Sequence, residues 1–224
     1  MNNDIAAVLW DMDGTLVDTE PYWIEREHEI VSEFGNGGWN ESHAHAIVGK
    51  DLRDSAQYIS DHGDVALPID EIVGHLLDGV VQRVNRRVPW RPGARELLAD
   101  LGRAGVPCAL VTMSWRRFTD AVVGVLPHGS FATVVAGDDV AQGKPHPEPY
   151  LTAAGRLGVD ASRCIAIEDS PTGVLSATAA GCVVIAIPNV VPIPDHLGHH
   201  RLGTLDGLTT TDLALIFSSH RLVE

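Results

Sequence analysis

The sequence predicts an α/β protein, with a parallel β-sheet covered by helices and a helical domain inserted near the N-terminus. Short apolar runs alternate with segments of helical periodicity along most of the chain. Between Thr19 and Arg87 this alternation stops, and helical stripes follow one another without a strand candidate. The short runs are apolar at consecutive positions, which is typical of strands that helices cover on both faces.

Five apolar runs are predicted as the strands of the sheet. They are Ile5–Trp10, Pro107–Thr112, Thr133–Ala136, Cys164–Ile167 and Cys182–Ile187. Helices are expected between most of them. One apolar stripe consists of Ala94, Leu97, Leu98, Leu101 and Ala104 and ends at Gly105, and another consists of Tyr150, Leu151, Ala154 and Leu157 and ends at Gly158.

The inserted segment is predicted to hold three helices. The first begins at Thr19 with Pro21 in its first turn, ends at Gly35, and turns Trp23, Ile24, Ile30, Val31 and Phe34 inward. Leu52, Ala56 and Ile59 carry the second, and a regular stripe from Ile72 to Val84 carries the third. The predicted domains are therefore 1–17 with 89–224 for the sheet, and 18–88 for the insert.

Composition excludes several classes of protein. The 224 residues carry 16 Lys and Arg against 30 Asp and Glu, a formal charge of −14, so neither a nucleic acid nor an anionic membrane is expected as a partner. No run is long and apolar enough for a membrane span, and no signal peptide is evident. Cys108, Cys164 and Cys182 lie in apolar runs and are interpreted as buried free thiols of a cytoplasmic protein.

Acidic pairs follow two of the predicted strands. Asp11 and Asp13, in Asp11-Met12-Asp13-Gly14-Thr15, come directly after the first strand, and Glu168-Asp169 comes after Cys164–Ile167. Taken alone, Asp-x-Asp-Gly is as typical of a turn as of a site. The carboxyl ends of parallel strands meet at one edge of a sheet, where ligands bind. Because converging carboxylates repel one another, a hard divalent cation, Mg²⁺, is the simplest compensation.

Two further polar residues are expected at the same edge. Thr112 ends the second strand, and Lys144 stands in Gly143-Lys144-Pro145-His146-Pro147, just before a helix led by proline. Taken alone, Thr112 is an ordinary strand residue, and Lys144 is an ordinary solvated lysine of a loop. Their shared position at strand ends is what indicates a site.

These residues, in this order, resemble the four signature motifs of the haloacid dehalogenase-like hydrolase superfamily. The motifs are Asp11 to Thr19, Thr112, Lys144 and Glu168-Asp169, and the resemblance covers nearly the whole chain. The sequence is most similar to the branch with a helical cap inserted after the first motif, which contains β-phosphoglucomutase and many sugar-phosphate phosphatases. The resemblance implies a Rossmann-like core with an α-helical cap domain.

The resemblance also implies a role for each motif residue. Asp11 would be the nucleophile that forms an aspartyl-phosphate, and Asp13 the general acid and then base. Thr112 and Lys144 would hold the phosphoryl oxygens. Mg²⁺ would bind Asp11, the backbone carbonyl of Asp13 and Asp169, with Glu168 as a further ligand or as a residue behind the ligands. The expected substrate is a small phosphorylated metabolite, a sugar or polyol phosphate.

The choice between phosphatase and phosphomutase depends on the cap. In β-phosphoglucomutase a glycine followed closely by an arginine grips the second phosphate, whereas here Gly49 is followed by Lys50-Asp51-Leu52-Arg53, so the arginine is displaced. This departure favours a phosphatase, with a mutase as the alternative. Lys50, Arg53 and Ser114 are the candidate substrate contacts.

A third reading belongs to another class of protein. The chain could bind a phosphorylated metabolite as a regulatory protein without turning it over, although a binder has no use for Asp13. The expected assembly is a monomer or a weak homo-oligomer. The His-rich stretch Pro188–His200 is interpreted as an exposed loop rather than a metal site.

Overall fold

The computed structural model describes residues 5–47 and 50–221. The chain divides into two compact units, Met1–Asp18 with Pro89–Glu224, here called the core unit, and Thr19–Val88, here called the cap unit. Each unit has its own hydrophobic interior, and the two are described separately.

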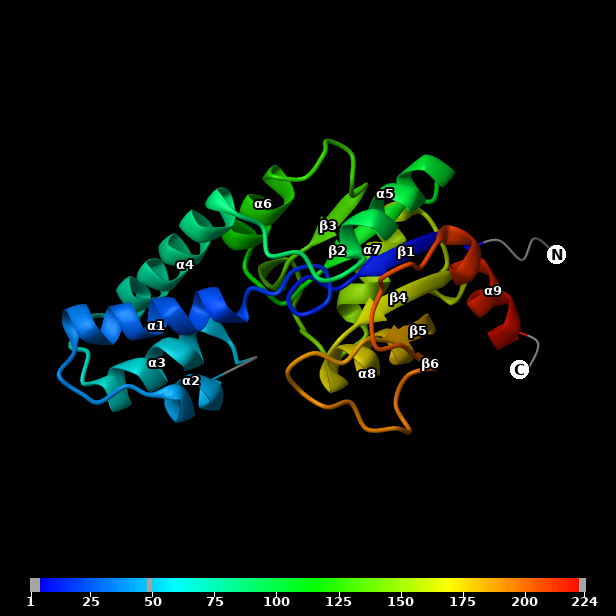
Figure 1. Ribbon diagram of the computed structural model, residues 1–224. Coiled ribbons are helices and arrows are strands. Elements are labelled where there is room, and N and C mark those ends of the chain that lie inside the picture. The colour runs from blue at the N-terminus through cyan, green and yellow to red at the C-terminus, as the bar shows by residue number, and fades with distance from the viewer. Residues whose placement is uncertain (1–4, 48–49, 222–224) are drawn as a thin grey trace. The chain divides into compact units, whose positions relative to one another are not determined.

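The core unit contains a six-stranded, fully parallel sheet in the order β3-β2-β1-β4-β5-β6 (Figure 1). The strands are β1 (Ala7–Trp10), β2 (Cys108–Val111), β3 (Thr133–Val135), β4 (Cys164–Glu168), β5 (Val183–Ala186) and β6 (His200–Arg201). The predicted α/β class is confirmed. The strand order reverses direction between β1 and β4, which is the position where open α/β sheets bind their ligands.

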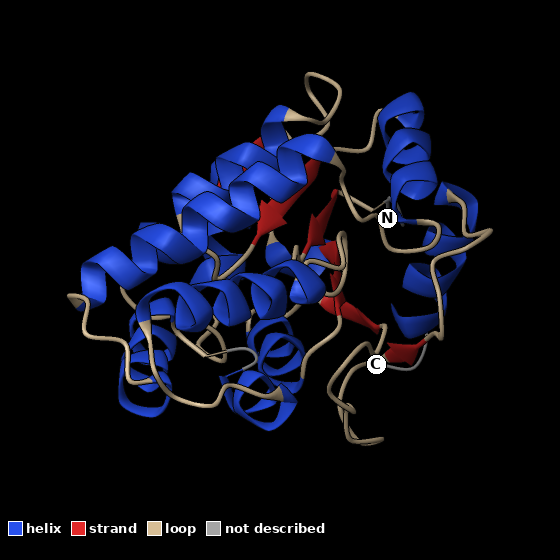
Figure 2. Cartoon of the chain, turned by 60° about the vertical axis from the view of Figure 1, so that its left-hand side comes forward, coloured by secondary structure: helices blue, strands red, loops and turns tan. Residues whose placement is uncertain are grey.

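Helices cover both faces of this sheet (Figure 2). The core-unit helices are α5 (Ala94–Ala104), α6 (Arg116–Gly124), α7 (Glu148–Leu157), α8 (Pro171–Ala179) and α9 (Thr210–Arg221), with short 3₁₀ turns η1 (Gly137–Asp139) and η2 (Ala161–Arg163). Helix α7 contacts β1, β2 and β3, α8 contacts β4 and β5, and α5 contacts β2 and α9. Val8 and Trp10 are as fully buried as Ala7 and Leu9, which explains why the strands are apolar at consecutive positions.

The stripe predicted on α7 is partly wrong. Tyr150 and Ala154 are buried as expected, but Leu151 is 48% exposed, and Ala153 takes its place in the core cluster. The helix therefore packs a narrow face of small residues against the sheet. This face brings α7 close to the strands and places Tyr150 beneath the ends of β1 and β4.

The described residues of the cap unit, 19–47 and 50–88, form four helices rather than the three predicted. They are α1 (Glu20–Phe34), α2 (Glu41–Ile47), α3 (Leu52–Gly63) and α4 (Ile69–Arg86). Helix α2 was missed because its seven residues carry only a weak apolar pattern. On α1, Ile30 and Val31 are buried as expected, whereas Trp23, Ile24 and Phe34 are half-buried and Glu27, which was not predicted, is buried.

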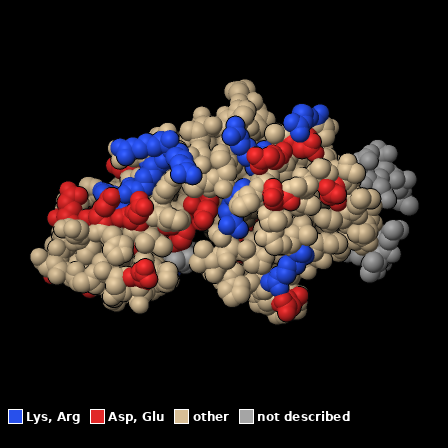
Figure 3. Space-filling model, in the orientation of Figure 1, with Lys and Arg blue, Asp and Glu red and all other residues tan. Residues whose placement is uncertain are grey.

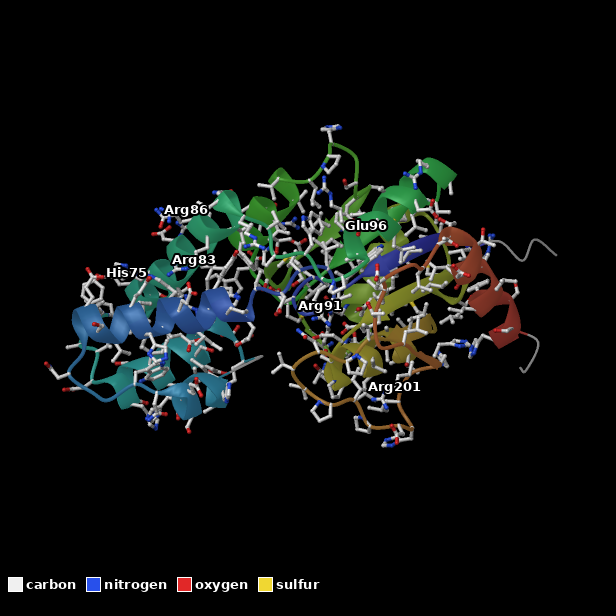
Figure 4. The ribbon with its side chains drawn as sticks, viewed as in Figure 1. His75, Arg83, Arg86, Arg91, Glu96 and Arg201 are labelled. Carbon is white, nitrogen blue, oxygen red and sulfur yellow. The ribbon has the colours of Figure 1, made fainter. Side chains whose placement is uncertain are left out.

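Ion pairs tie α1 to α4 on one face of the cap unit (Figure 3). Arg83 contacts Glu25 at 3.0 Å and Glu29 at 2.5 Å, and Arg26 donates through Nε to the carbonyl oxygen of His75 at 2.9 Å. Figure 4 labels Arg83 and His75 on α4. Gly79 makes room for Arg26, because a Cβ there would lie 2.2 Å from Arg26 Cδ.

Two further expectations can be compared with the structure. Cys108, Cys164 and Cys182 are free and buried, as predicted. Among the residues described, no helix combines the length and the apolar character that a membrane span needs.

Candidate active site

The candidate site lies where β1 and β4 end side by side in the core unit. Trp10 pairs with Ile167, and the Asp11 N–H donates to the carbonyl oxygen of Ile167 at 3.0 Å. This register sets Asp11 beside Glu168 and Asp169. Gly14, with φ +86°, closes the turn after Asp13, and a Cβ at Gly14 would lie 1.9 Å from Asp169 Oδ2. The glycine of the first motif is therefore required by the approach of an acidic side chain.

Lys144 is the cation at the centre of the site. Its Nζ donates to Asp11 Oδ1 at 2.7 Å, to Glu168 Oε1 at 2.6 Å and to the carbonyl oxygen of Val111 at 2.9 Å. The side chain is 5% exposed. Burial lowers the pKa of Lys144, but the charges of Asp11 and Glu168 outweigh it and hold that pKa above its usual range. Lys144 therefore stays charged, contrary to its ordinary reading as a solvated loop lysine.

Glu168 is a fully buried carboxylate whose two oxygens both accept hydrogen bonds. Oε1 accepts from Lys144 and from the Tyr150 hydroxyl at 2.7 Å. Oε2 accepts from Ser170 Oγ at 3.1 Å and from the backbone N–H groups of Asp169 and Ser170 at 3.2 and 3.4 Å. Burial raises the pKa of Tyr150 well above its usual value, so its hydroxyl keeps the proton that it donates.

The start of α8 is built around this carboxylate. Ser170 caps the helix by accepting from the Gly173 N–H at 3.1 Å. A Cβ at Gly173 would lie 1.9 Å from both Cδ and Oε1 of Glu168. A glycine at this position leaves the space that the Glu168 carboxylate occupies.

Asp13 lies in a second group of contacts at the same edge. Ser114 Oγ donates to Asp13 Oδ2 at 2.7 Å, and Thr112 Oγ1 lies 3.4 Å from the same oxygen. The Ser114 N–H donates to Thr112 Oγ1 at 3.0 Å, which fixes the loop after β2. The hydroxyl groups of Thr112 and Ser114 thus hold the Asp13 carboxylate.

Three carboxylates of the core unit form a cluster suited to a cation. Asp11, Glu168 and Asp169 each offer an oxygen within 4.8 Å of the others. Burial raises the pKa of Asp169 to about 9, with the Asp11 and Glu168 charges adding to it. Burial also raises the pKa of Asp11, to about 7, against the opposing effect of Lys144. Asp11 Oδ2 is buried and has no hydrogen-bond partner among the described residues.

The structure brings together most of the site residues that the sequence indicated. Asp11, Asp13, Thr112, Ser114, Lys144, Glu168 and Asp169 all meet at one edge of the core sheet. The remaining candidates belong to the cap unit. Arg53 pairs with Asp70 at 2.7 Å, and Lys50 Nζ lies 5.2 Å from the ring centre of Tyr58. Gly49 lies outside the described residues.

Two residues of the site were not predicted from the sequence. Tyr150 was assigned to the apolar stripe of α7, since nothing in the sequence indicates that its hydroxyl faces Glu168. Met113 was passed over between Thr112 and Ser114, yet its Sδ accepts the backbone N–H of Lys144 at 3.2 Å. The Met113 side chain also packs against Gly143, where a Cβ would lie 2.8 Å from its Sδ.

Comparisons with known proteins agree with this geometry. The family model for haloacid dehalogenase-like hydrolases matches residues 8–187. Hexitol phosphatase A of Escherichia coli (strain K12) is 33% identical over 192 residues, which cover 80% of this chain and 81% of that protein. A bifunctional riboflavin kinase/FMN phosphatase of Arabidopsis thaliana is 31% identical over 86% of this chain, which spans only 50% of that relative's length.

A solved structure shares the architecture across both units. CbbY from Rhodobacter sphaeroides in complex with phosphate has a TM-score of 0.80 at 26% identity, covering 91% of this chain and 96% of that chain. The fold and the site define a hydrolase built on a doubly wound sheet. The chain belongs to the haloacid dehalogenase-like hydrolase family, and it is an enzyme of the phosphoric monoester hydrolase class.

Proposed function

We propose that this enzyme is a Mg²⁺-dependent phosphatase that hydrolyses a small sugar or polyol phosphate through an aspartyl-phosphate at Asp11. The observation that carries the proposal is the state of Asp11. Its Oδ1 is held by the buried Lys144, while its Oδ2 is buried at the edge of the sheet without a partner among the described residues. A carboxylate so oriented can offer Oδ2 to a cation and Oδ1, beside the Lys144 charge, for attack on phosphorus.

Asp13 is the proposed general acid and base. It follows Asp11 by two residues and accepts a hydrogen bond from Ser114 at 2.7 Å, which orients its carboxyl group. It would protonate the departing alkoxide of the substrate in the first step. In the second step it would accept a proton from the water that hydrolyses the aspartyl-phosphate. A residue with this double task separates a phosphatase from a protein that only binds phosphate.

Lys144 and Thr112 are proposed to stabilise the transferred phosphoryl group. Lys144 brings a buried positive charge next to Asp11 and reduces the repulsion between the nucleophile and an incoming dianion. Thr112 stands at the end of β2 with its hydroxyl toward Asp13. Both residues therefore lie within reach of the same small volume.

The residues present fit a magnesium ion. Asp11 Oδ2 is an orphaned buried oxygen, and hard oxygen ligands are those that Mg²⁺ prefers. Asp11, the backbone carbonyl of Asp13, and Asp169 would hold the ion. Glu168 would act behind these ligands, because both of its oxygens already accept hydrogen bonds. When bound, the ion supplies positive charge that favours the approach and transfer of a phosphoryl group.

The relatives of this chain support the proposed substrate class. Hexitol phosphatases A and B of Escherichia coli, CbbY proteins and a phosphoglycolate phosphatase are among the related proteins. Lys50 and Arg53 of the cap unit are proposed to contact the substrate. The two solved structures named β-phosphoglucomutase are 18% and 23% identical to this chain and bear on the fold alone. The phosphatase therefore remains preferred over the mutase.

A colorimetric assay with p-nitrophenyl phosphate tests the proposal. We expect wild-type enzyme to release phosphate with Mg²⁺ present, to stop when EDTA is added, and to recover when Mg²⁺ is restored. Asp11→Asn lacks a nucleophilic carboxylate and should lose at least about 10³-fold in kcat while keeping its fold. Turnover that survives EDTA, or that persists in purified Asp11→Asn, would contradict the mechanism.

A further inference from the structure

All three protons of the Lys144 ammonium group are used within the protein. They go to Asp11 Oδ1 at 2.7 Å, to Glu168 Oε1 at 2.6 Å and to the carbonyl oxygen of Val111 at 2.9 Å. An ammonium group has three donors and no more. If Lys144 binds a phosphoryl oxygen, as the proposed function requires, one of these bonds has to be exchanged for it.

The two carboxylates differ in what such an exchange would leave behind. Asp11 Oδ2 already lacks a hydrogen-bond partner among the described residues. If Lys144 moved away from Asp11, the carboxylate would also lose the hydrogen bond to Oδ1. Glu168 Oε1 has a second donor, the Tyr150 hydroxyl at 2.7 Å. Glu168 is fully buried, and a buried carboxylate oxygen without a donor is strongly disfavoured.

We propose that Tyr150 is a positioning residue whose hydroxyl keeps Glu168 Oε1 hydrogen-bonded while Lys144 turns from Glu168 to the bound phosphoryl group. This inference rests on the proposed function and extends it to a residue beneath the site. Tyr150 is itself fully buried on α7, so it acts through Glu168 and Lys144 rather than on the substrate.

The surroundings of Lys144 suit a small movement of its side chain. Its Nζ lies 5.2 Å from the ring centre of Tyr150, within the range of a cation–π contact. The aromatic ring therefore stays favourable to the cation when one hydrogen bond is exchanged. A phenylalanine at this position would keep the ring and remove only the donor.

The proposal predicts a particular kinetic pattern for Tyr150→Phe. Without the Tyr150 hydroxyl, Glu168 Oε1 has no donor once Lys144 leaves it. The free-energy cost of this unpaired buried oxygen is the same in the substrate complex and in the transition state. A loss common to both raises KM and leaves kcat unchanged. The affinity for inorganic phosphate should fall with it, by about tenfold.

The test compares wild type, Tyr150→Phe and Tyr22→Phe, since the Tyr22 hydroxyl donates to the carbonyl oxygen of Arg87 within the cap unit. Calorimetry measures inorganic phosphate binding with Mg²⁺ present and Mg²⁺ binding alone, and p-nitrophenyl phosphate gives kcat and KM. We expect Tyr150→Phe to bind phosphate about tenfold more weakly, with KM raised in parallel and both kcat and Mg²⁺ affinity within about twofold of wild type. Tyr22→Phe should match wild type.

Several results would overturn the inference. Unchanged phosphate affinity in folded Tyr150→Phe would do so, as would a fall in kcat at constant KM or an equal loss of Mg²⁺ and phosphate binding. A crystal structure of wild type with Mg²⁺ and phosphate gives an independent answer, because Lys144 should then contact phosphate and no longer Glu168. Lys144 still bonded to Glu168 there would reject the idea. A wild type with neither turnover nor phosphate binding would instead reject the proposed function.

Discussion

Glu168 shows how much of the site is set at the scale of single residues. Its carboxylate is fully buried, yet each oxygen has at least two donors, from Lys144 and Tyr150 on one side and from Asp169 and Ser170, just before α8, on the other. A buried anion with this many partners fixes Lys144 beside Asp11. The position of the Glu168 carboxylate also requires a glycine at position 173, because a side chain there would occupy the same space.

Gly173→Ala should therefore be harmful although alanine favours helices. Its Cβ would meet the Glu168 carboxylate at 1.9 Å, and we expect a loss of about 1–3 kcal/mol in the free energy of unfolding together with at least a tenfold loss of kcat/KM. Urea unfolding and p-nitrophenyl phosphate turnover measure the two effects.

Gly155→Ala is the matched control on α7. Nothing lies within 4 Å of a Cβ at Gly155, so this variant should gain about 0.5–1 kcal/mol from helix propensity and keep its activity. If both variants gain stability alike and retain turnover, Gly173 has no role in seating Glu168.

The sequence predicted the residues of this site better than it predicted their partners. Asp11, Asp13 and Asp169 could be found because polar groups at the ends of apolar strands are conspicuous, and Lys144 was identified through the resemblance of its motif to the family's. Tyr150 could not, because a tyrosine in an apolar helical stripe reads as a core residue whether or not its hydroxyl has a partner. Sequence periodicity also could not show that both carboxylate oxygens of Glu168 accept hydrogen bonds from other groups of the protein.

At the scale of elements, α1 carries a carboxyl group in an unusual place. Glu27 is 5% exposed, and neither its Oε2 nor the indole nitrogen of Trp39 has a hydrogen-bond partner among the described residues. Burial raises the pKa of Glu27 to about 8, and the charge of Glu20 adds to this rise. The interior of the cap unit is therefore sensitive to pH.

The sign of this sensitivity follows from proton linkage. Below the ordinary pKa of about 4.5 Glu27 is protonated in both states, and its contribution to stability is fully present. Between about pH 4.5 and about pH 8 the folded state holds a proton that the unfolded state has lost, so the contribution falls as the pH rises and is gone above about pH 8. Glu27→Gln should therefore match wild type near pH 4 and exceed it by about 1–3 kcal/mol near pH 9.

Urea unfolding of wild type and variant across this pH range measures the difference. Glu33→Gln, at an exposed position of the same helix, is the control and should show no pH-dependent difference from wild type. A Glu27→Gln variant that loses stability relative to wild type as the pH rises would mean that Glu27 is held by contacts of its charged form.

Elements with few apolar residues were the ones that sequence reasoning missed. Helix α2 has only seven residues, and β6 has two, the first of which, His200, ends the stretch interpreted as a His-rich loop. Strand β6 forms because its backbone pairs with β5 at His200 and Arg201, a contact that needs no apolar pattern. Long, fully buried strands such as β1 and β4 were evident because burial on both faces demands consecutive apolar residues.

At the scale of the whole molecule, an acidic protein has to accept an anionic substrate. The formal charge is −14, and the candidate site itself gathers three carboxylates within 4.8 Å. Lys144 and the proposed Mg²⁺ offset this charge locally. The reversal of strand order between β1 and β4 brings residues far apart in the sequence to the same point, so the site is a product of topology as much as of motif.

Trapping the proposed covalent intermediate is the most direct test of the account. Wild-type enzyme turning over p-nitrophenyl phosphate with Mg²⁺ is treated with hydroxylamine, which converts an acyl phosphate to a hydroxamate, and the peptides are then analysed by mass spectrometry. We expect a substrate-dependent hydroxamate at Asp11, absent from Asp11→Asn. Turnover without modification at Asp11, or with the hydroxamate on another carboxylate, would contradict the assignment of the nucleophile.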